Sequence, residues 1–222
     1  MNWCVGSNHE LYIADFNGDG RDDMLCNHNG TDNKLIAFAT PNGTFNDDPS
    51  WQGVPGWCHG GSFFTGDFNG DGRHDLLCKN LDNAPNGNMW IALASVAGIF
   101  DANYPSTTYH EANWCFSSED EPELQLLATG DFNGDGRNDL LCRRPLQNKI
   151  RISLMENDGS FGGHHWGQTD GFCYMASEKL IIVDVNGDGL SDMKCIDIAT
   201  GYTRIVLVND LLFCFHIYFI LS

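Results

Sequence analysis

Basic residues are scarce in this chain of 222 residues, in which Lys and Arg together number 12 and Asp and Glu number 30. The basic residues form no cluster along the sequence, whereas a protein that binds nucleic acid gathers them into a patch that neutralises phosphates. The composition therefore argues against a nucleic-acid partner. It also leaves a formal net charge of −18, so the many carboxylates need a separate explanation.

The chain also lacks any sustained amphipathic helical pattern. The apolar segment at 211–222 has only twelve residues, and a membrane span needs about 20, so a membrane partner is not expected. Residues 1–4 show neither the charged nor the apolar region of a signal peptide, and they already belong to a repeating pattern. We therefore expect the chain to be a fragment of a longer secreted protein.

Signatures of catalysis are missing as well. The nucleophile motif G-x-S-x-G does not occur, and nearly all closely spaced carboxylates belong to one repeated loop. The histidines that could act as acids or bases do not recur at a fixed offset: they are His59, His74, His110, His164 and His165. The last two follow a glycine pair and are expected in a turn. We therefore expect that the protein is not an enzyme.

Four copies of an acidic loop are the strongest positive signal. They read DFNGDGRDD from Asp15, DFNGDGRHD from Asp67, DFNGDGRND from Asp131 and DVNGDGLSD from Asp184. Alternate residues of such a tight turn direct side-chain oxygens inward, and the glycines at loop positions 4 and 6 allow the positive φ angles that the turn needs. Three carboxylates so close together repel one another unless a divalent cation lies between them. Calcium suits this flexible all-oxygen site better than magnesium, which demands stricter octahedral geometry.

The predicted calcium ligands are the residues at loop positions 1, 3, 5, 7 and 9. Position 7 would contribute only its backbone carbonyl, which leaves its side chain free to vary. The ligand residues are Asp15, Asn17, Asp19, Arg21 and Asp23; Asp67, Asn69, Asp71, Arg73 and Asp75; Asp131, Asn133, Asp135, Arg137 and Asp139; and Asp184, Asn186, Asp188, Leu190 and Asp192. The fourth copy has Val185 in place of Phe and Leu190 in place of Arg, but it keeps every side-chain ligand.

The residues around the loops distinguish them from an EF-hand. An EF-hand has a bidentate Glu at position 12 and continues into a helix. Here position 12 is a cysteine in every copy, and short β-rich segments flank each loop, such as 11–13 before the first and 24–25 after it. The loops begin 52, 64 and 53 residues apart. Each loop is therefore predicted to join two strands in a repeat of blade size, which indicates an all-β array.

With these features the chain resembles the FG-GAP or VCBS repeats of calcium-binding β-propellers, over residues 3–209. The resemblance implies one β-propeller domain over 1–210, built of four blades that are either a complete ring or an arc of a larger one. The repeats would span approximately 3–56, 57–113, 114–171 and 172–210, with the apolar tail 211–222 outside them. Calcium at the loops would be structural and would hold the hairpin of each blade.

Eight of the nine cysteines occur as two per repeat, and Cys214 is the ninth. Pairing within repeats would join Cys4 to Cys26, Cys58 to Cys78, Cys115 to Cys142 and Cys173 to Cys195. Pairing between neighbouring repeats, such as Cys26 to Cys58, stays open, although it leaves Cys4 without a partner. Regular pairs indicate an oxidising compartment, so we expect an extracellular protein. Sequons at Asn29 and Asn42 agree with a glycoprotein.

Two kinds of function remain open. Aromatic residues that recur once per repeat could stack on sugars or, as is more common, pack between blades. They are Trp3, Trp51, Trp57, Tyr109, Trp114, Trp166 and Phe172. We expect non-catalytic recognition of a glycan or an extracellular protein, of the lectin or adhesion type. The alternative is a structural propeller within a larger secreted protein or carbohydrate-active enzyme.

Overall fold

The computed structural model describes residues 4–29, 33–45, 51–52, 57–58, 60–80, 88–100, 107–109, 115, 126–144, 149–168, 171–208 and 216–220. Strands and turns make up this part of the chain, and it contains no helix. Accordingly, none of the residues described forms a helix with the length and apolarity that a membrane crossing requires. The predicted all-β class is confirmed.

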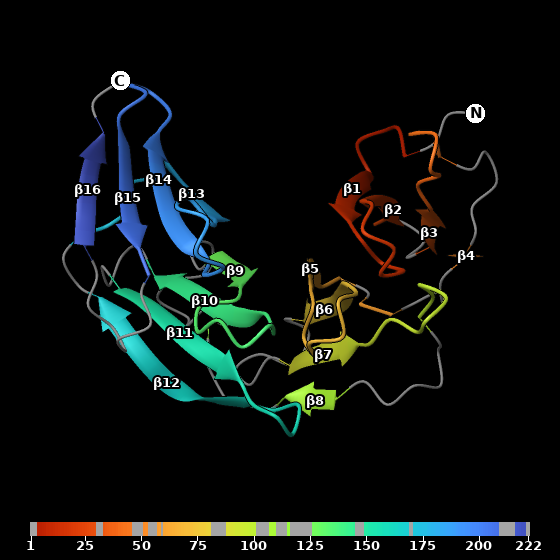
Figure 1. Ribbon diagram of the computed structural model, residues 1–222. Helices are drawn as coiled ribbons and strands as arrows, with labels where there is room; N and C mark the ends of the chain where they lie inside the picture. The colour runs from red at the N-terminus through yellow and green to blue at the C-terminus, as the bar shows by residue number, and fades with distance from the viewer. Residues whose placement is uncertain are drawn as a thin grey trace. The chain divides into compact units, whose positions relative to one another are not determined.

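The strands form four antiparallel sheets of four strands each, and every sheet follows chain order (Figure 1). We call these sheets blades 1 to 4. Blade 1 contains β1 (His9–Ala14), β2 (Asp23–His28), β3 (Asn33–Ala37) and β4 (Trp51–Gln52); blade 2 contains β5 (Ser62–Gly66), β6 (Asp75–Asn80), β7 (Asn88–Ala92) and β8 (Thr107–Tyr109). Blade 3 contains β9 (Leu126–Gly130), β10 (Asp139–Arg144), β11 (Lys149–Met155) and β12 (Phe161–Gln168); blade 4 contains β13 (Glu178–Val183), β14 (Asp192–Asp197), β15 (Thr203–Leu207) and β16 (His216–Ile220). Four-stranded meanders of this kind are the blades of a β-propeller.

The four blades group into two compact units. Unit 1 is Met1–Glu111 and holds blades 1 and 2, whereas unit 2 is Ala112–Ser222 and holds blades 3 and 4. The boundary lies close to the predicted limit between the second and third repeats. Two blades are the smallest group in which each sheet can cover an apolar face of the other.

The apolar tail has a different place from the one expected. Residues His216–Ile220 form β16, and Tyr218 pairs with Ile205 of β15. The segment therefore supplies the fourth strand of blade 4, as β4, β8 and β12 do in the other blades. β-branched and aromatic residues fit a strand, and pairing satisfies backbone groups that β15 would otherwise expose at an edge.

Each unit has its own apolar core between its two blades. The core of unit 1 includes Phe16, Leu25, Ile36, Phe63, Leu76 and Phe100. The core of unit 2 includes Phe132, Leu141, Ile152, Phe172, Leu190, Met193 and Val206. The strands contribute by alternation: in β11, Ile150 and Ile152 are buried while Arg151 between them is half-buried. Full burial of such a side chain stabilises the fold by about 2 kcal/mol.

A disulfide crosslinks every blade. The pairs are Cys4–Cys26, Cys58–Cys78, Cys115–Cys142 and Cys173–Cys195, with Cα–Cα distances of 5.4 to 5.5 Å. Pairing within repeats is thus confirmed over pairing between repeats. The first cysteine of each pair has a φ between 52° and 66°, a conformation that residues other than glycine rarely adopt. Each crosslink therefore fixes a backbone conformation that is otherwise unfavourable.

Candidate functional site

The acidic loops lie between the first and second strands of each blade. We call them loop 1 (15–23), loop 2 (67–75), loop 3 (131–139) and loop 4 (184–192). In loop 1, Asp15 accepts the N–H groups of Gly18 and Gly20, each at 2.7 Å, one on each carboxylate oxygen. Both glycines have positive φ, of 74° and 81°. The other three loops repeat these bonds at 2.6 to 3.0 Å, so the tight turn follows from the local sequence.

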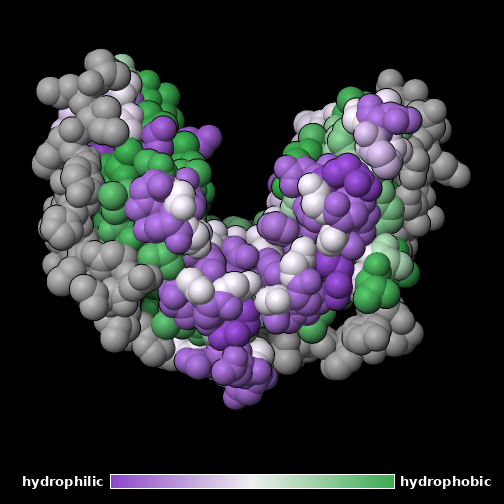
Figure 2. All heavy atoms as spheres, in the orientation of Figure 1, coloured by the Kyte–Doolittle hydropathy of each residue, from purple (hydrophilic) through white to green (hydrophobic). Residues whose placement is uncertain are grey.

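Positions 3 and 5 also accept hydrogen bonds from the loop backbone. Asn17 Oδ1 accepts the N–H of Asp19 at 3.0 Å, and Asp19 Oδ1 accepts the N–H of Arg21 at 3.0 Å. Such bonds favour a charged carboxylate. In loop 4, hydrogen bonds from backbone N–H groups lower the pKa of the exposed Asp184 at position 1. The N–H of Gly189 makes the largest contribution. Much of the face shown in Figure 2 is hydrophilic (purple).

Position 9 differs from the others because its carboxylate is completely buried. Asp23, Asp75, Asp139 and Asp192 each have an exposed fraction of 0%. In loop 3, Asp139 accepts the N–H of Phe132 at 2.9 Å and that of Met155, at the end of β11, at 2.8 Å. Burial raises the pKa of both Asp75 and Asp139 to about 7, and the carboxylates at positions 1 and 5 of the same loop add to the rise. Position 9 therefore joins the loop to the third strand and completes a concentration of negative charge.

The side chain at position 7 is more constrained than the sequence predicted. Arg21, Arg73 and Arg137 each form an ion pair with the position-5 carboxylate of their own loop. Their Nε atoms also donate to backbone carbonyls that follow or end the third strand, those of Ala39, Ala94 and Met155, each at 3.3 Å. The guanidinium thus lies beside a carboxylate that is predicted to bind a cation. Spacing along the chain could not reveal this contact.

Loop 4 replaces this ion pair with apolar packing. Leu190 is only 3% exposed and belongs to the core of unit 2, whereas Val185 at position 2 is 42% exposed. In loops 1 and 3 the reverse holds, because Phe16 and Phe132 at position 2 are buried in the core. The two substitutions in the fourth copy are therefore linked: the apolar anchor of the loop moves from position 2 to position 7.

Within each unit the two loops contact each other. The N–H of His74 in loop 2 donates to the carbonyl of Asp15 in loop 1 at 2.8 Å, and the N–H of Ser191 in loop 4 donates to the carbonyl of Asp131 in loop 3 at 2.6 Å. A Cβ added to Gly18 would lie 2.9 Å from Cγ of Arg73. The position-7 side chain of the later loop therefore packs against the position-4 glycine of the earlier one.

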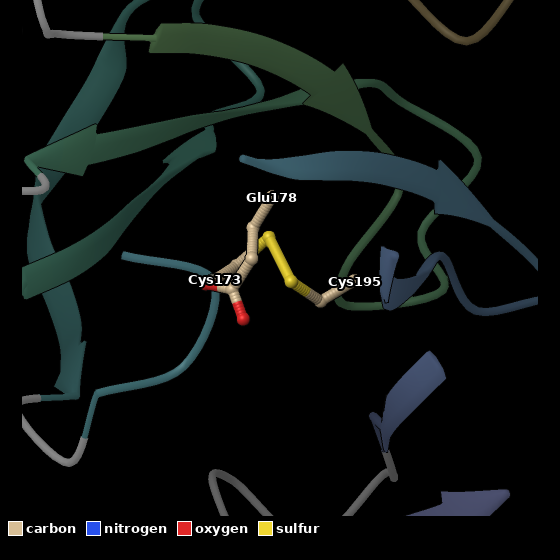
Figure 3. Close-up of side chains that lie close together, drawn as sticks. All are labelled: Cys173, Glu178 and Cys195. Atoms are coloured by element: carbon tan, nitrogen blue, oxygen red, sulfur yellow. A yellow bond between two sulfur atoms is a disulfide. The ribbon is translucent and has the colours of Figure 1, made fainter. Parts of the chain in front are cut away.

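The loops offer the donor set that calcium prefers, because every potential ligand is an oxygen. Their carboxylates are nevertheless not drawn together into a tight cage. Among the described residues, the only three His, Cys, Asp or Glu side chains whose ligand atoms lie within 4.8 Å of one another are Cys173, Glu178 and Cys195. Those two sulfurs form a disulfide (Figure 3), and Glu178 pairs with Arg204, so this group is not a metal centre. A cation at a loop would have to draw the carboxylates inward.

A cavity of about 480 Å³ lies in unit 1 between blades 1 and 2. Its lining combines polar side chains with aromatic rings and the sulfur of a disulfide: Glu10, Tyr12, Asn29, Cys58, Gly60, Gly61, Ser62, Phe63 and Phe64. The hydroxyl of Tyr12 donates to Glu10 Oε2 at 2.7 Å, and its ring lies 5.0 Å from that of Phe63.

Sequence reasoning missed this cavity because its key residues do not repeat. Strand register places Ser62 and Phe64, Leu126 and Ala128, and Lys179 and Ile181 at the positions of Glu10 and Tyr12 in the other blades. A search for features shared by all four repeats passes over a site found in one. The usable signal was a charged and an aromatic residue alternating on the first strand of blade 1.

The recurring aromatics and histidines have varied positions. Trp57 packs edge-on against Phe63 at 5.5 Å, and Phe172 is buried beneath the guanidinium of Arg204, so both pack rather than stand exposed. Trp51, Tyr109 and Trp166 lie on β4, β8 and β12. Trp3, Trp114, His59 and His110 lie outside the described residues. His164 and His165 belong to strand β12, not to the turn that was expected.

Comparison of the sequence with known families decides the relationship. The sequence model of the FG-GAP-like repeat matches residues 15–78 and 131–193, which together exceed half of the chain. The chain belongs to the FG-GAP-like repeat family. Each matched stretch of the FG-GAP repeats begins at the first loop of one unit and ends on the second strand of that unit's second blade. No curated protein has a sequence that matches the chain.

Two solved structures share the fold of these FG-GAP repeats. One is a lectin of Agrocybe aegerita that recognises non-reducing terminal N-acetylglucosamine, with a TM-score of 0.65, 18% identity and coverage of 95% of this chain and 51% of the lectin. The other is the Tc holotoxin pore of Photorhabdus luminescens, with a TM-score of 0.58, 17% identity and coverage of 95% of this chain and 9% of the toxin chain. The chain thus spans about half the length of the lectin and a small part of the toxin. At these identities the similarity shows the fold alone.

Proposed function

We propose that this FG-GAP-repeat chain is a non-catalytic, extracellular recognition module that binds a glycan in the cavity between blades 1 and 2. The cavity itself carries the proposal. Its volume of about 480 Å³ lies within the range of about 300–1,000 Å³ typical of small-molecule sites. Such sites combine apolar and aromatic walls with a few polar groups that fix the orientation of the ligand.

The lining suits a sugar in particular. Tyr12 and Phe64, which are half-buried, supply aromatic surface for the C–H face of a pyranose. Glu10 and Ser62 are exposed and supply acceptors and a donor for hydroxyl groups. The similarity of fold to a lectin supports the same class of function, and the four disulfides support an oxidising, extracellular location.

Calcium is the second part of the proposal. The ligands would be the side chains at loop positions 1, 3, 5 and 9 and the carbonyl at position 7, and the ion would stabilise each hairpin without taking part in chemistry. Extracellular calcium modules bind with a Kd of about 10⁻⁴ to 10⁻³ M. At ten times Kd each site would add about 1.4 kcal/mol, so four independent sites would add roughly 6 kcal/mol. Chelation should then lower the Tm sharply, and Asp71→Ala should remove one site while leaving the others.

A glycan array, probed with the oxidised protein in calcium and again in chelator, tests the proposal. We expect binding to a narrow class of glycans, and we expect Glu10→Gln and Tyr12→Phe to weaken it. Glu156→Gln is the matched control, because Glu156 is an exposed carboxylate of unit 2 that does not line the cavity. A blank array from a folded protein that calcium stabilises would contradict glycan recognition and favour a structural propeller in a larger protein.

A further inference from the structure

The four loops differ in charge next to position 5. Loops 2 and 3 each carry three carboxylates and one guanidinium, whereas loop 4 carries three carboxylates and the neutral Leu190. The formal charge of loop 4 is therefore more negative by one unit than that of loop 2 or loop 3. Loop 1 has the same formal charge as loop 4, because it carries an additional exposed carboxylate, Asp22, at position 8, which is not a predicted ligand position. At the predicted ligand positions the side chains are otherwise the same in all four loops, so position 7 is the principal electrostatic difference there.

The guanidinium in the arginine loops is held in place at two points. In loops 2 and 3, Nη2 of the arginine pairs with Oδ2 of the position-5 carboxylate. Nε of the same arginine donates to a backbone carbonyl at 3.3 Å. The side chains of Arg73 and Arg137 are each only 19% exposed. In loops 2, 3 and 4 alike, Oδ2 of the position-5 carboxylate accepts an amide N–H of the position-3 asparagine, at 2.8 to 2.9 Å. Loop 4 differs because no Lys or Arg in the described ranges pairs with Asp188.

We propose that the residue at position 7 sets the cation affinity of each loop, so that loop 4 is the tightest site and the three arginine loops are weaker but less dependent on a cation. The proposal rests on the calcium binding proposed above. A cation that enters an arginine loop must share the position-5 carboxylate with the guanidinium, and the two positive charges repel each other. For a partly exposed pair we expect an affinity difference of about three- to tenfold.

The same geometry predicts the opposite order of stability without a cation. In the arginine loops the guanidinium serves as an internal countercharge, which loop 4 lacks. Loop 4 gains packing instead, because a Cβ added to Gly134 of loop 3 would lie 2.9 Å from Cδ2 of Leu190. In chelator, amide hydrogen exchange should therefore show loop 4 opening before loops 2 and 3.

Calcium titration of the full chain by isothermal calorimetry tests the proposal. The wild type should show one tight site and three weaker sites. Arg73→Leu should convert loop 2 and give two tight sites, and Leu190→Arg should leave none. Lys179→Leu is the matched control, since it removes one positive charge from an exposed position on β13 outside the loops; it should keep the wild-type ratio.

The outcomes separate this proposal from the calcium proposal. Calcium binding by the wild type with an unchanged number of tight sites in Arg73→Leu would overturn the role of position 7 and leave calcium binding intact. No binding by the wild type would overturn both. Because Leu190 is buried, Leu190→Arg is interpreted only if it folds, whereas Arg73→Leu places leucine against Gly18 as Leu190 lies against Gly134. Unchanged hydrogen exchange of loop 2 in the Arg73→Leu protein in chelator would also refute the internal countercharge.

Discussion

The buried carboxylate at loop position 9 should stabilise its blade even without a cation, and Asp139→Asn tests this. One oxygen of Asp139 accepts the N–H of Phe132 at 2.9 Å and the other that of Met155 at 2.8 Å. Asparagine keeps one acceptor and turns an amide nitrogen toward the second N–H, which is buried. A buried donor left without an acceptor costs about 1–3 kcal/mol. We therefore expect a loss of about 2 kcal/mol in the free energy of unfolding.

Urea unfolding of the full chain in chelator at pH 5, followed by circular dichroism, measures the loss. The hydroxyl oxygen of a neutral carboxylic acid can still accept an N–H, whereas an amide nitrogen cannot. At pH 5 the folded protein keeps Asp139 largely neutral, because burial raises its pKa to about 7. Relief of a buried charge therefore does not enter the comparison with neutral asparagine. With a slope of about 1–3 kcal/mol per molar urea, the midpoint should fall by roughly 1 M.

Asp135→Asn is the control, because it makes the same chemical change at the exposed position 5 of the same loop. Its carboxylate pairs with Arg137, and exposed ion pairs contribute about 0.2–1 kcal/mol. The control should therefore lose less stability than Asp139→Asn. Equal losses in the two variants would refute the argument that position 9 holds the loop to the third strand.

Three further predictions concern other parts of the molecule. Burial raises the pKa of Asp75 to about 7, above its ordinary value, so its contribution to stability in chelator is present below about pH 4 and lost as the pH rises through about 7. A pH series of melting curves should show this fall, and Asp75→Asn should reduce it without abolishing it, because burial raises the pKa of Asp139 as well. Replacing Cys58 and Cys78 together by Ala should cost about 3 kcal/mol, measured by urea unfolding, and a loss below about 1 kcal/mol would show that the crosslink does not restrict the unfolded chain as the entropy model requires. A glycan attached at Asn29, which lines the cavity, should block ligand binding, whereas a glycan at Asn42 in an exposed turn should not. In proteins from a glycosylating host, Asn29→Gln should therefore bind the ligand better than Asn42→Gln. Equal binding by the two variants would show that the cavity is not the site.

The loops were predictable because their bonds are local. Asp15 bonds to Gly18 and Gly20, three and five residues away, so the spacing of Asp and Gly in the sequence already specifies the turn. The disulfide pattern was predictable for a similar reason, since each pair encloses one hairpin and recurs in every repeat.

Features of single repeats were not predictable in this way. Glu10 and Tyr12 form one wall of the cavity, yet their counterparts in the other blades are unlike them. Residues His216–Ile220 share no motif with β4, β8 or β12, yet they pair with β15 in the same place. In both cases the position in the sheet, rather than similarity to another repeat, gives the residues their role.

The sequence by itself therefore determined the four repeats, their turns and the chemistry of the acidic side chains, because these depend on residues within about one hairpin of each other. Only the tertiary structure decided which carboxylates are buried and which are exposed. Asp23 meets the N–H of Ala39, sixteen residues away, only after the third strand has paired with the second. The packing of Arg73 on Gly18 likewise depends on two blades lying together. Burial and contact between blades are properties of the folded unit, and spacing along the chain does not contain them.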